Sequence, residues 1–466
     1  GYSIDNSLRV NSGDSPSMTR TPSSAGNRKT FSLSTWFKLS KLSGERVIFF
    51  TDDGVGGNNN FDYIAINGSH KLFIYNYVGS EGYNLTSNQV FRDTSAWYHL
   101  LVVFDTTQST SSNRIKVYLN GSQITSWATA NYPSQNFDTK FNNTEPQGFF
   151  KYPDQSASYY DGYLAETHLI DGTAKQPSDF GEFDSDSGIW KPIEYTGSYG
   201  TNGFYLDFEN SGSLGADQSG NGNNFTPTNL ASTDQTTDTP TNNFCTFNPL
   251  ARNNGNTYAE GNTVYDYSNN YQKAGIGSQT FSSGKWYAEF KKNGSQMPHY
   301  GIAGDTYHSD GNTVTDTGGS WNNDIKGHTG TVVLQIDGTG TRNIWADGSD
   351  TGTDTDFYAG TGDIIMIAFD SDTGKIWFGK NGTWSSSGNP ATGSNPTYTY
   401  SGSATKDFTF AVSTENNSSI SANFGNPSFS ISSGNSDGNG FGNFEYAPPS
   451  GYLALCTQNL ATALSP

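Results

Sequence analysis

Residues 362–384, GDIIMIAFDSDTGKIWFGKNGTW, decide the fold class of this chain. The stretch consists of two short apolar runs separated by the turn-forming residues Ser-Asp-Thr-Gly. In its second half Ile376 and Phe378 alternate with Trp377 and a glycine, and a period of two is typical of a β-strand. The sequence therefore predicts a β-hairpin with Ile376 and Phe378 on one face and Trp377 on the other.

The same period recurs along most of the chain. Alternating or short apolar runs occupy 31–39, 46–50, 61–66, 71–77, 97–105, 114–121, 162–172, 285–292, 299–304, 331–337, 342–347, 408–414 and 419–425. Asn67-Gly68 between two of these runs is the strongest short hairpin signal. No run has a convincing helical period, and LATAL at the C-terminal end is the nearest candidate helix. Short strands at this spacing predict β-sandwiches.

The predicted fold class is all-β, with two β-sandwich (jelly-roll) domains joined by a long, loop-rich connector. We expect the first sandwich at 1–214, the connector at 215–254 and the second sandwich at 255–466. The connector is set apart by its polar run of Gly, Asn, Asp and Thr, which are residues that favour turns. The 30 Phe, 27 Tyr and 9 Trp residues supply enough apolar volume for sizeable cores.

Composition also excludes two kinds of partner. The net charge is −19 with no basic cluster, so an interaction with the phosphates of nucleic acid is not expected. A membrane-spanning helix needs about 18 or more apolar residues, and the longest apolar runs, such as 100–104 and 364–369, are far shorter. We therefore expect no nucleic-acid partner and no membrane insertion.

The first half of the chain resembles the laminin-G-like members of the concanavalin-A-like jelly rolls. The resemblance is carried by FSLSTWFKL (31–39), WYHLLVVFD (97–105), RIKVYLNG (114–121) and DGYLAETHLIDG (161–172), which follow the order of that family's strands. The second half resembles a SPRY domain over roughly 280–430, through KWYAEF, HYGIAG, ISANFGNPSF and, above all, the hairpin at 362–384. Both resemblances imply two-sheet sandwiches.

The pairing of these two domains, together with the closing segment FEYAPPSGYLALCTQNL, is similar to virion appendage proteins of marine tailed phages. The resemblance implies a phage virion structural protein, such as a tail fibre or decoration, located on the virion surface and thus extracellular. Its partners would be a host surface glycan or receptor and other virion proteins, and it would be a homo-oligomer, by analogy a trimer. Two alternatives stay open, a polysaccharide-degrading enzyme and a bacterial cell-surface adhesin.

No catalytic constellation is recognised. The six histidines are scattered, and His99 and His168 fall inside predicted strands, where a packed structural role is expected. Glu166 and Asp171 are near each other in sequence, but they lack the strand spacing of the paired carboxylates that glycoside hydrolases use. We therefore expect a protein that is not an enzyme and has no catalytic residues.

Aromatic residues in polar loops are the best candidates for a ligand surface, because a sugar presents an apolar face and a rim of hydroxyl groups. The candidate ligand-binding residues are Tyr307, Asp310, Trp321, Asn322 and Trp345. Packing of the tryptophans at a sheet edge is the open alternative.

Calcium is the only cofactor considered, and none is required. Asp52, Asp53 and Asn58 form a loop of hard oxygen ligands after an early strand, which is the chemistry that calcium prefers. A solvated polar loop explains the same residues.

The two cysteines, Cys245 and Cys456, lie just before and just after the second sandwich. Because domain termini are often close together, we expect their segments to pair as neighbouring strands with the thiols on facing positions. A disulfide and two buried free thiols are both open.

Overall fold

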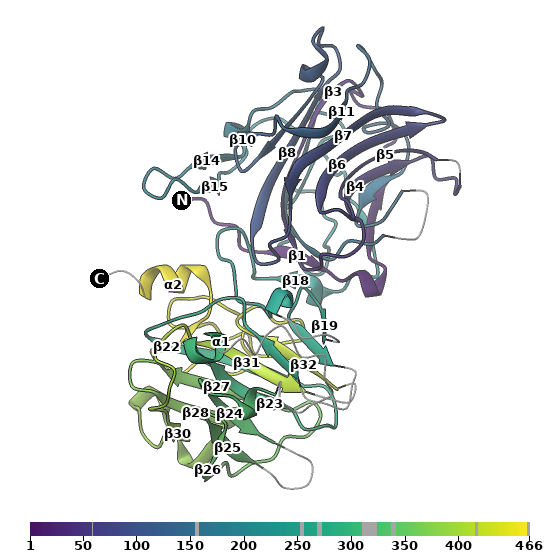
Figure 1. Ribbon diagram of the computed structural model, residues 1–466. Coiled ribbons are helices and arrows are strands. Elements are labelled where there is room, and N and C mark those ends of the chain that lie inside the picture. The colour runs from purple at the N-terminus through teal and green to yellow at the C-terminus, as the bar shows by residue number, and fades with distance from the viewer. Residues whose placement is uncertain are drawn as a thin grey trace. The chain divides into compact units, whose positions relative to one another are not determined.

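The structure is a computed structural model that describes residues 1–57, 59–153, 158–251, 256–267, 273–309, 324–336, 342–414 and 418–463 (Figure 1). The chain divides into two compact units, Gly1–Thr241 and Asn242–Pro466. In the described residues the α-helices are α1 (Asp305–Ser309) and α2 (Thr457–Ala463), and the second of these overlaps the LATAL candidate. Short 3-10 turns are η1 (Ser12–Asp14), η2 (Ser111–Asn113), η3 (Pro177–Asp179), η4 (Ser232–Asp234), η5 (Pro249–Ala251), η7 (Ile325–Gly327), η8 (Ser385–Ser387) and η9 (Pro390–Thr392). The all-β prediction is confirmed.

The first unit contains two large antiparallel sheets, here called sheets A and B. Sheet A has the order β10 (Ser122–Gln123), β9 (Ile115–Leu119), β8 (Trp97–Asp105), β3 (Thr30–Leu39), β13 (Gly162–Asp171), β1 (Ser7–Val10) and β18 (Gln235–Thr236), with β16 (Phe204–Leu206) paired to β13. Sheet B has the order β11 (Trp127–Asn131), β7 (Glu81–Val90), β6 (Lys71–Val78), β5 (Asn60–Ile66), β4 (Arg46–Asp52), β12 (Gln147–Phe149), β2 (Ser17–Arg20) and β17 (Thr226–Thr228). A separate hairpin joins β14 (Gly181–Phe183) to β15 (Trp190–Pro192).

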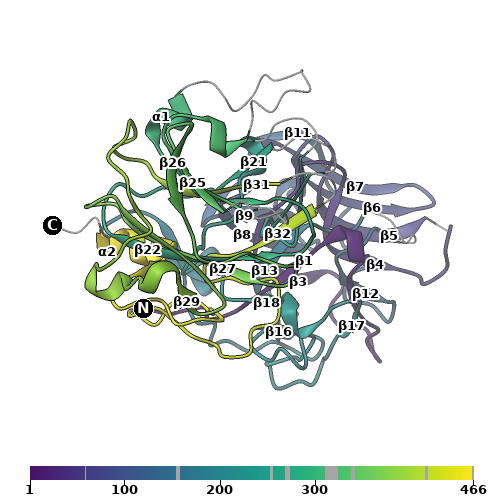
Figure 2. The ribbon, with the colours of Figure 1, turned by 90° about the horizontal axis from the view of Figure 1, so that it is seen from below.

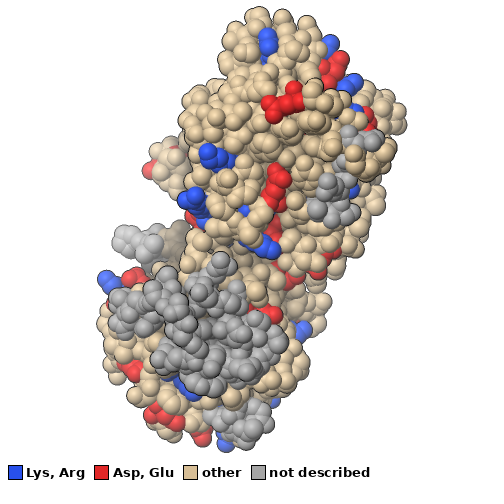
Figure 3. All heavy atoms as spheres, turned by 45° about the vertical axis from the view of Figure 1, so that its right-hand side comes forward, with Lys and Arg blue, Asp and Glu red and all other residues tan. Residues whose placement is uncertain are grey.

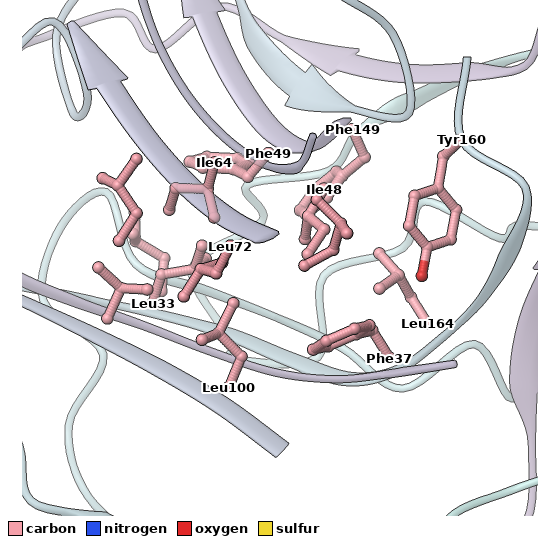
Figure 4. Close-up of a cluster of buried hydrophobic side chains, with 14 of the residues drawn as sticks. Leu33, Phe37, Ile48, Phe49, Ile64, Leu72, Leu100, Phe149, Tyr160 and Leu164 are labelled. Carbon is pink, nitrogen blue, oxygen red and sulfur yellow. The ribbon is translucent and has the colours of Figure 1, made fainter. Parts of the chain in front are cut away.

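The core of the first unit lies between these two sheets. Leu33, Phe37, Leu100 and Leu164 of sheet A face Ile48, Phe49, Ile64, Leu72 and Phe149 of sheet B (Figure 4). Each of these side chains is almost fully buried. Neighbouring residues of these strands otherwise point to opposite faces, as the period of two in the sequence requires, whereas Ile48 and Phe49 both enter the core at a register shift between β4 and β5.

The polar stretch that follows residue 214 is ordered against the first unit as far as Thr241. β17 pairs with β2, and β18 pairs with β1. A buried ion pair between Lys38 Nζ and Asp238 Oδ2, 2.8 Å long, fastens the end of this stretch to sheet A. Trp97 Nε1 donates a second bond, 3.0 Å, to Asp238 Oδ1.

The second unit also contains two large sheets. The nine-stranded sheet has the order β19 (Asn256–Ala259), β20 (Val264–Tyr267), β32 (Ser418–Asn423), β22 (Lys285–Lys292), β27 (Ile364–Asp370), β28 (Lys375–Lys380) and β29 (Thr383–Trp384), with β30 (Tyr398–Thr399) paired to β28 and β33 (Leu453–Ala454) to β22. The six-stranded sheet has the order β21 (Lys273–Ile276), β31 (Thr409–Thr414), β23 (His299–Ala303), β24 (Thr331–Gln335), β25 (Asn343–Ala346) and β26 (Ser349–Asp354). Figure 2 labels β21, β31, β25 and β26 of this sheet.

The predicted hairpin is present as β27 and β28, and its predicted faces are confirmed. Ile376 and Phe378 belong to the core between the two sheets, whereas Trp377 belongs to a cluster on the outer face of the nine-stranded sheet. That outer cluster includes Phe444 and Tyr452 of the C-terminal segment. Because this segment covers the outer face, both faces of β27 are buried, which explains its nearly continuous apolar sequence.

The predicted proximity of the two cysteine segments is confirmed, but the prediction that the two thiols face each other is wrong. Phe244 pairs with Cys456 in an antiparallel bridge, and Cys245 N donates to Leu455 O at 2.9 Å. Both cysteines are buried and neither forms a disulfide, which is the second of the two alternatives that the sequence leaves open. A shift of one residue places the two thiols on opposite faces of the paired segments.

Candidate functional site

Strand β6 carries large apolar side chains on both of its faces. Leu72 and Ile74 point into the core of the first unit, and they alternate with Phe73, Tyr75 and Tyr77. The latter three rings lie on the outer face of sheet B, where each remains partly exposed. We call Phe73, Tyr75 and Tyr77 the ring ladder.

The planes of the ring ladder are nearly parallel. The centroids of Phe73 and Tyr75 are 5.0 Å apart with an interplanar angle of 18°. Those of Tyr75 and Tyr77 are 6.5 Å apart with an angle of 23°. Since all three side chains belong to one strand, the strand itself fixes their spacing. The ladder is therefore a preformed aromatic surface.

A wall of further aromatic residues borders the ladder toward β5 and β4. Phe61 and Tyr63 lie on the outer face of β5, and the ring of Tyr152 covers them at centroid distances of 5.8 and 5.2 Å. Next to them Phe50 is fully buried, with Lys151 Nζ 5.2 Å from its ring centroid. Burial of this half of the outer face leaves the ring ladder as its accessible aromatic part.

A polar margin borders the ladder on the opposite side, toward β7 and the edge strand β11. It consists of Glu81, Asn84, Thr86, Thr129 and Asn131. The carboxylate of Glu81 accepts hydrogen bonds from Asn84 Nδ2 (3.1 Å) and Asn131 Nδ2 (2.6 Å). Thr86 Oγ1 donates to Asn84 Oδ1 at 3.0 Å. These bonds hold the amide groups in place beside the aromatic rings.

The ladder and its margin belong to one line of cross-strand neighbours that spans all eight strands of sheet B. This register row consists of Asn131, Asn84, Tyr75, Tyr63, Phe50, Gly148, Thr19 and Thr226. A side chain at Gly148 would collide with the carbonyl oxygen of Met18, so the close approach of β12 and β2 requires glycine there.

This combination suits a ligand with one apolar face and one hydroxyl-bearing edge. Aromatic rings bury the C–H face of such a ligand, and fixed amide, hydroxyl and carboxylate groups bind its hydroxyls. Tyr63 OH donates to Glu45 Oε1 at 3.1 Å, which adds a carboxylate on the aromatic side. Burial raises the pKa of Glu45, an effect opposed by this hydrogen bond and by Arg46.

The two described ligand-binding candidates of the second unit lie on or against its six-stranded sheet. Tyr307 of α1 is 1% exposed and packs in a cluster with Ile276, Val333 and Ala411. Trp345 of β25 is partly buried, with Lys326 Nζ 4.8 Å from its ring centroid. The other three candidates, Asp310, Trp321 and Asn322, lie outside the described residues.

The candidate calcium ligands Asp52 and Asp53 hold the loop that follows β4. Asp52 Oδ1 accepts from Gly54 N at 2.9 Å. Asp53 accepts from Val55 N at 3.0 Å and from Asn60 Nδ2 at 3.0 Å. Asn58 lies outside the described residues. In the described part of the chain, no three His, Cys, Asp or Glu side chains form a group suited to a metal ion.

One buried trio has the composition of a hydrolase triad without its arrangement. Asp324 Oδ1 is 2.7 Å from His299 Nδ1 and also accepts from Ser413 Oγ at 2.7 Å. In a triad the serine lies at Nε2, on the other side of the ring from the acid. Here the serine and the acid share one side, and all three residues are buried. The trio therefore fastens η7 to the six-stranded sheet.

Glu166 and Asp171 on β13 have different partners. Glu166 accepts from Tyr2 OH (2.9 Å) and Tyr205 OH (2.8 Å). Asp171 accepts from Asn27 N and Asn202 N, and so fixes two loops. These two carboxylates are thus engaged in structural hydrogen bonds.

The histidines of sheet A have structural surroundings. The ring of His168 stacks on Tyr205 with centroids 4.4 Å apart. His99 is buried between Ser34 Oγ and Trp190 Nε1, and burial lowers its pKa to about 3. The packed role predicted for both histidines is confirmed.

The ring ladder was missed in the sequence, although a signal for it is present. The run 71–77, KLFIYNY, places aromatic residues at 73, 75 and 77, with aliphatic residues between them at 72 and 74. A half-exposed strand normally has one polar face, so a row of aromatic residues on the face opposite the core indicates a surface with a function. The polar margin gives no such signal, because Asn84 and Asn131 meet only through the register of β7 and β11.

None of the described helices is both long and apolar enough to cross a membrane. A comparison with curated protein sequences found no match. Structural comparison found two SPRY domains. The SPRY domain of human HERC1 is 15% identical, with 38% of this chain and 96% of that chain covered and a TM-score of 0.26. The TRIM65 PSpry domain is 14% identical, with 38% of this chain and 89% of that chain covered and a TM-score of 0.30. It also found a heptameric SAP-like pentraxin from Limulus polyphemus, which is 14% identical, with 38% of this chain and 80% of that chain covered and a TM-score of 0.28.

The family comparison covers most of sheets A and B. Residues 12–178 match a laminin-G-type sequence profile described as the concanavalin A-like lectin/glucanases superfamily. This range contains β3 to β13 and with them the ring ladder and the polar margin. The first unit of this chain thus has a lectin-like, concanavalin A-like jelly-roll fold.

Proposed function

We propose that the protein is a lectin-like appendage of a tailed-phage virion that binds a host surface glycan through the ring ladder of its first unit. The observation that carries the glycan proposal is the pairing of Tyr75 with Asn84, which sets a partly exposed aromatic ring beside a hydrogen-bonded amide. Aromatic and amide groups in this order match the two faces of a sugar ring.

The proposed non-enzymatic role is supported by the chemistry of the same surface. The carboxylates near it, Glu45 and Glu81, each accept hydrogen bonds from neighbouring side chains. Such carboxylates orient a bound sugar by accepting hydrogen bonds from its hydroxyl groups. A polysaccharide-degrading enzyme is the alternative, and the appearance of new reducing ends during incubation with host polysaccharide would favour it.

The glycan proposal is tested by a polysaccharide-binding screen on the wild type and two variants of the full chain. We expect Tyr75→Ala to weaken binding by about tenfold, ~1.4 kcal/mol, because it removes the central ring of the ladder. Tyr75→Phe keeps the ring and is expected to bind within about twofold of the wild type. Equal binding by Tyr75→Ala and the wild type would contradict the proposal.

The virion assignment is supported by the resemblance of the domain pairing and of the closing segment FEYAPPSGYLALCTQNL to phage appendages. Antibodies against the protein should label purified virions and not the envelopes of uninfected cells. The reverse pattern would favour a bacterial adhesin. A homotrimer is proposed by the same analogy, and light scattering that gives the 50.4 kDa mass of one chain would contradict it.

A further inference from the structure

We infer that the ligand of the ring ladder is an uncharged glycan, as opposed to a sulfated or uronate-rich polysaccharide. This inference rests on the proposed function and specifies the class of ligand for the same site. It is carried by the charges of the register row and of the side chains that touch it.

No member of the register row carries a charge at neutral pH: it contains no Asp, Glu, His, Lys or Arg. It crosses all eight strands of sheet B, which at about 4.8 Å per strand step amounts to about 34 Å. Its members are amide, phenol, phenyl, glycine and hydroxyl groups, as the pairing from Asn131 through Tyr75 to Thr226 shows. Tyr63, Phe50 and Gly148 of the row are buried, so a ligand on the ring ladder meets the accessible neutral members Tyr75, Asn84 and Asn131.

The charged groups beside the row do not favour an anion. Glu81 is bonded to both amides of the polar margin, and Glu45 is bonded to Tyr63. Two ammonium groups balance these carboxylates: Lys151 against Phe50, and Lys71 two residues before Phe73 on β6. Among the described residues, the charges named here leave this face with no excess of positive charge for a sulfate or carboxylate.

Arginine, which binds such anions through paired N–H groups, does not occupy any position of the row. The nearest arginine along β4 is Arg46, which is 1% exposed and donates through Nη2 to the carbonyl oxygen of Asn67. Its guanidinium is thus buried away from a ligand on the outer face.

The charge of the whole chain acts in the same direction. A net charge of −19 repels polyanions at long range. On the face that Figure 3 shows, basic and acidic side chains are scattered and most of the described surface is uncharged. A neutral polymer is not repelled by this net charge.

The test uses the full chain on immobilised dextran, β-1,3-glucan, agarose, dextran sulfate and alginate, in about 50 mM and about 500 mM NaCl, between which surface electrostatics are strongly screened. We expect binding to one or more of the neutral polymers, with affinities that change by less than about twofold between the two salt concentrations. Binding to the anionic polymers alone, with a loss of about tenfold or more at high salt, would overturn the inference and leave the glycan proposal standing. Binding to no polymer would contradict the proposed function and this inference together.

A variant that removes one positive charge near the ladder gives an independent measurement. Lys71→Gln removes one ammonium group near the ladder and keeps a side chain of similar length. If the ligand is neutral, we expect the variant to bind it with an affinity within about twofold of that of the wild type. If the ligand is anionic, the variant should bind it several-fold more weakly than the wild type, and mostly at low salt.

Discussion

Cys245 and Cys456 lie on neighbouring antiparallel segments, one residue out of register with each other. Cys245 lies opposite Leu455, and both belong to the core between the sheets of the second unit. Cys456 lies opposite Phe244, and both belong to the outer cluster. Because neighbouring residues of an extended strand point to opposite faces, the two sulfurs cannot bond in this register.

The thiols are therefore expected to remain reduced and protected. Both side chains are 0% exposed, and burial raises the pKa of Cys456 to about 11, so its reactive thiolate is scarce at neutral pH. We expect the native protein to resist alkylation by iodoacetamide and the denatured protein to take up one label at each of its 2 cysteines. An intact mass that is two hydrogens lighter than the reduced chain would contradict this register.

Phe378 is expected to be a principal core residue of the second unit. It is 0% exposed on β28 and faces the six-stranded sheet, so Phe378→Ala leaves a cavity and should cost about 3–5 kcal/mol. Leu250, which is 57% exposed, supplies the matched control, and Leu250→Ala should change stability by less than about 0.5 kcal/mol. Both are measured by urea unfolding. A loss below about 1 kcal/mol for Phe378→Ala would show that the ring is not in the core.

Glu289 makes the second unit less stable as the pH rises. Burial raises its pKa from 4.5 to about 7, against hydrogen bonds from Tyr446 N, Glu445 N, Tyr287 OH and Asn423 Nδ2. Between pH 4.5 and about pH 7 the carboxyl group of Glu289 keeps its proton in the folded state and loses it in the unfolded state. The free energy of unfolding therefore falls as the pH rises through this window.

Glu289→Gln removes this titration and should flatten the pH dependence of the urea midpoint between about pH 4.5 and about pH 7. Asp62 in the first unit, whose pKa burial raises to about 6, titrates in both proteins and cancels in the comparison. If the wild-type urea midpoint instead rises relative to that of the variant over this pH window, the predicted direction of the pH dependence is wrong.

Calcium binding by the loop after β4 is untested, and the hydrogen bonds within that loop favour the alternative, a solvated polar loop whose shape does not depend on the ion. Asp52 and Asp53 already accept bonds from Gly54 N and Val55 N. We therefore expect the same thermal midpoint in excess calcium and in EGTA. A rise of the midpoint with calcium that disappears in Asp53→Asn would establish a site there, since ligands of the folded state stabilise it.

Period-two patterns were sufficient to predict the strands and, within one hairpin, the faces of Ile376 and Trp377. They were not sufficient for contacts that depend on register between distant segments. The sequence predicted that the thiols of Cys245 and Cys456 face each other. The observed pairing is shifted by one residue, which places the two thiols on opposite faces. For the same reason the ring ladder was visible in KLFIYNY, whereas its polar margin required the pairing of β7 with β11.

The most direct measurement of the central claim is a crystal structure of the full chain soaked with a neutral oligosaccharide from the binding screen. The account predicts sugar density in van der Waals contact with Tyr75, with hydroxyl groups within hydrogen-bond distance of Asn84 and Asn131. Sugar density confined to the second unit, with an empty ring ladder, would contradict it.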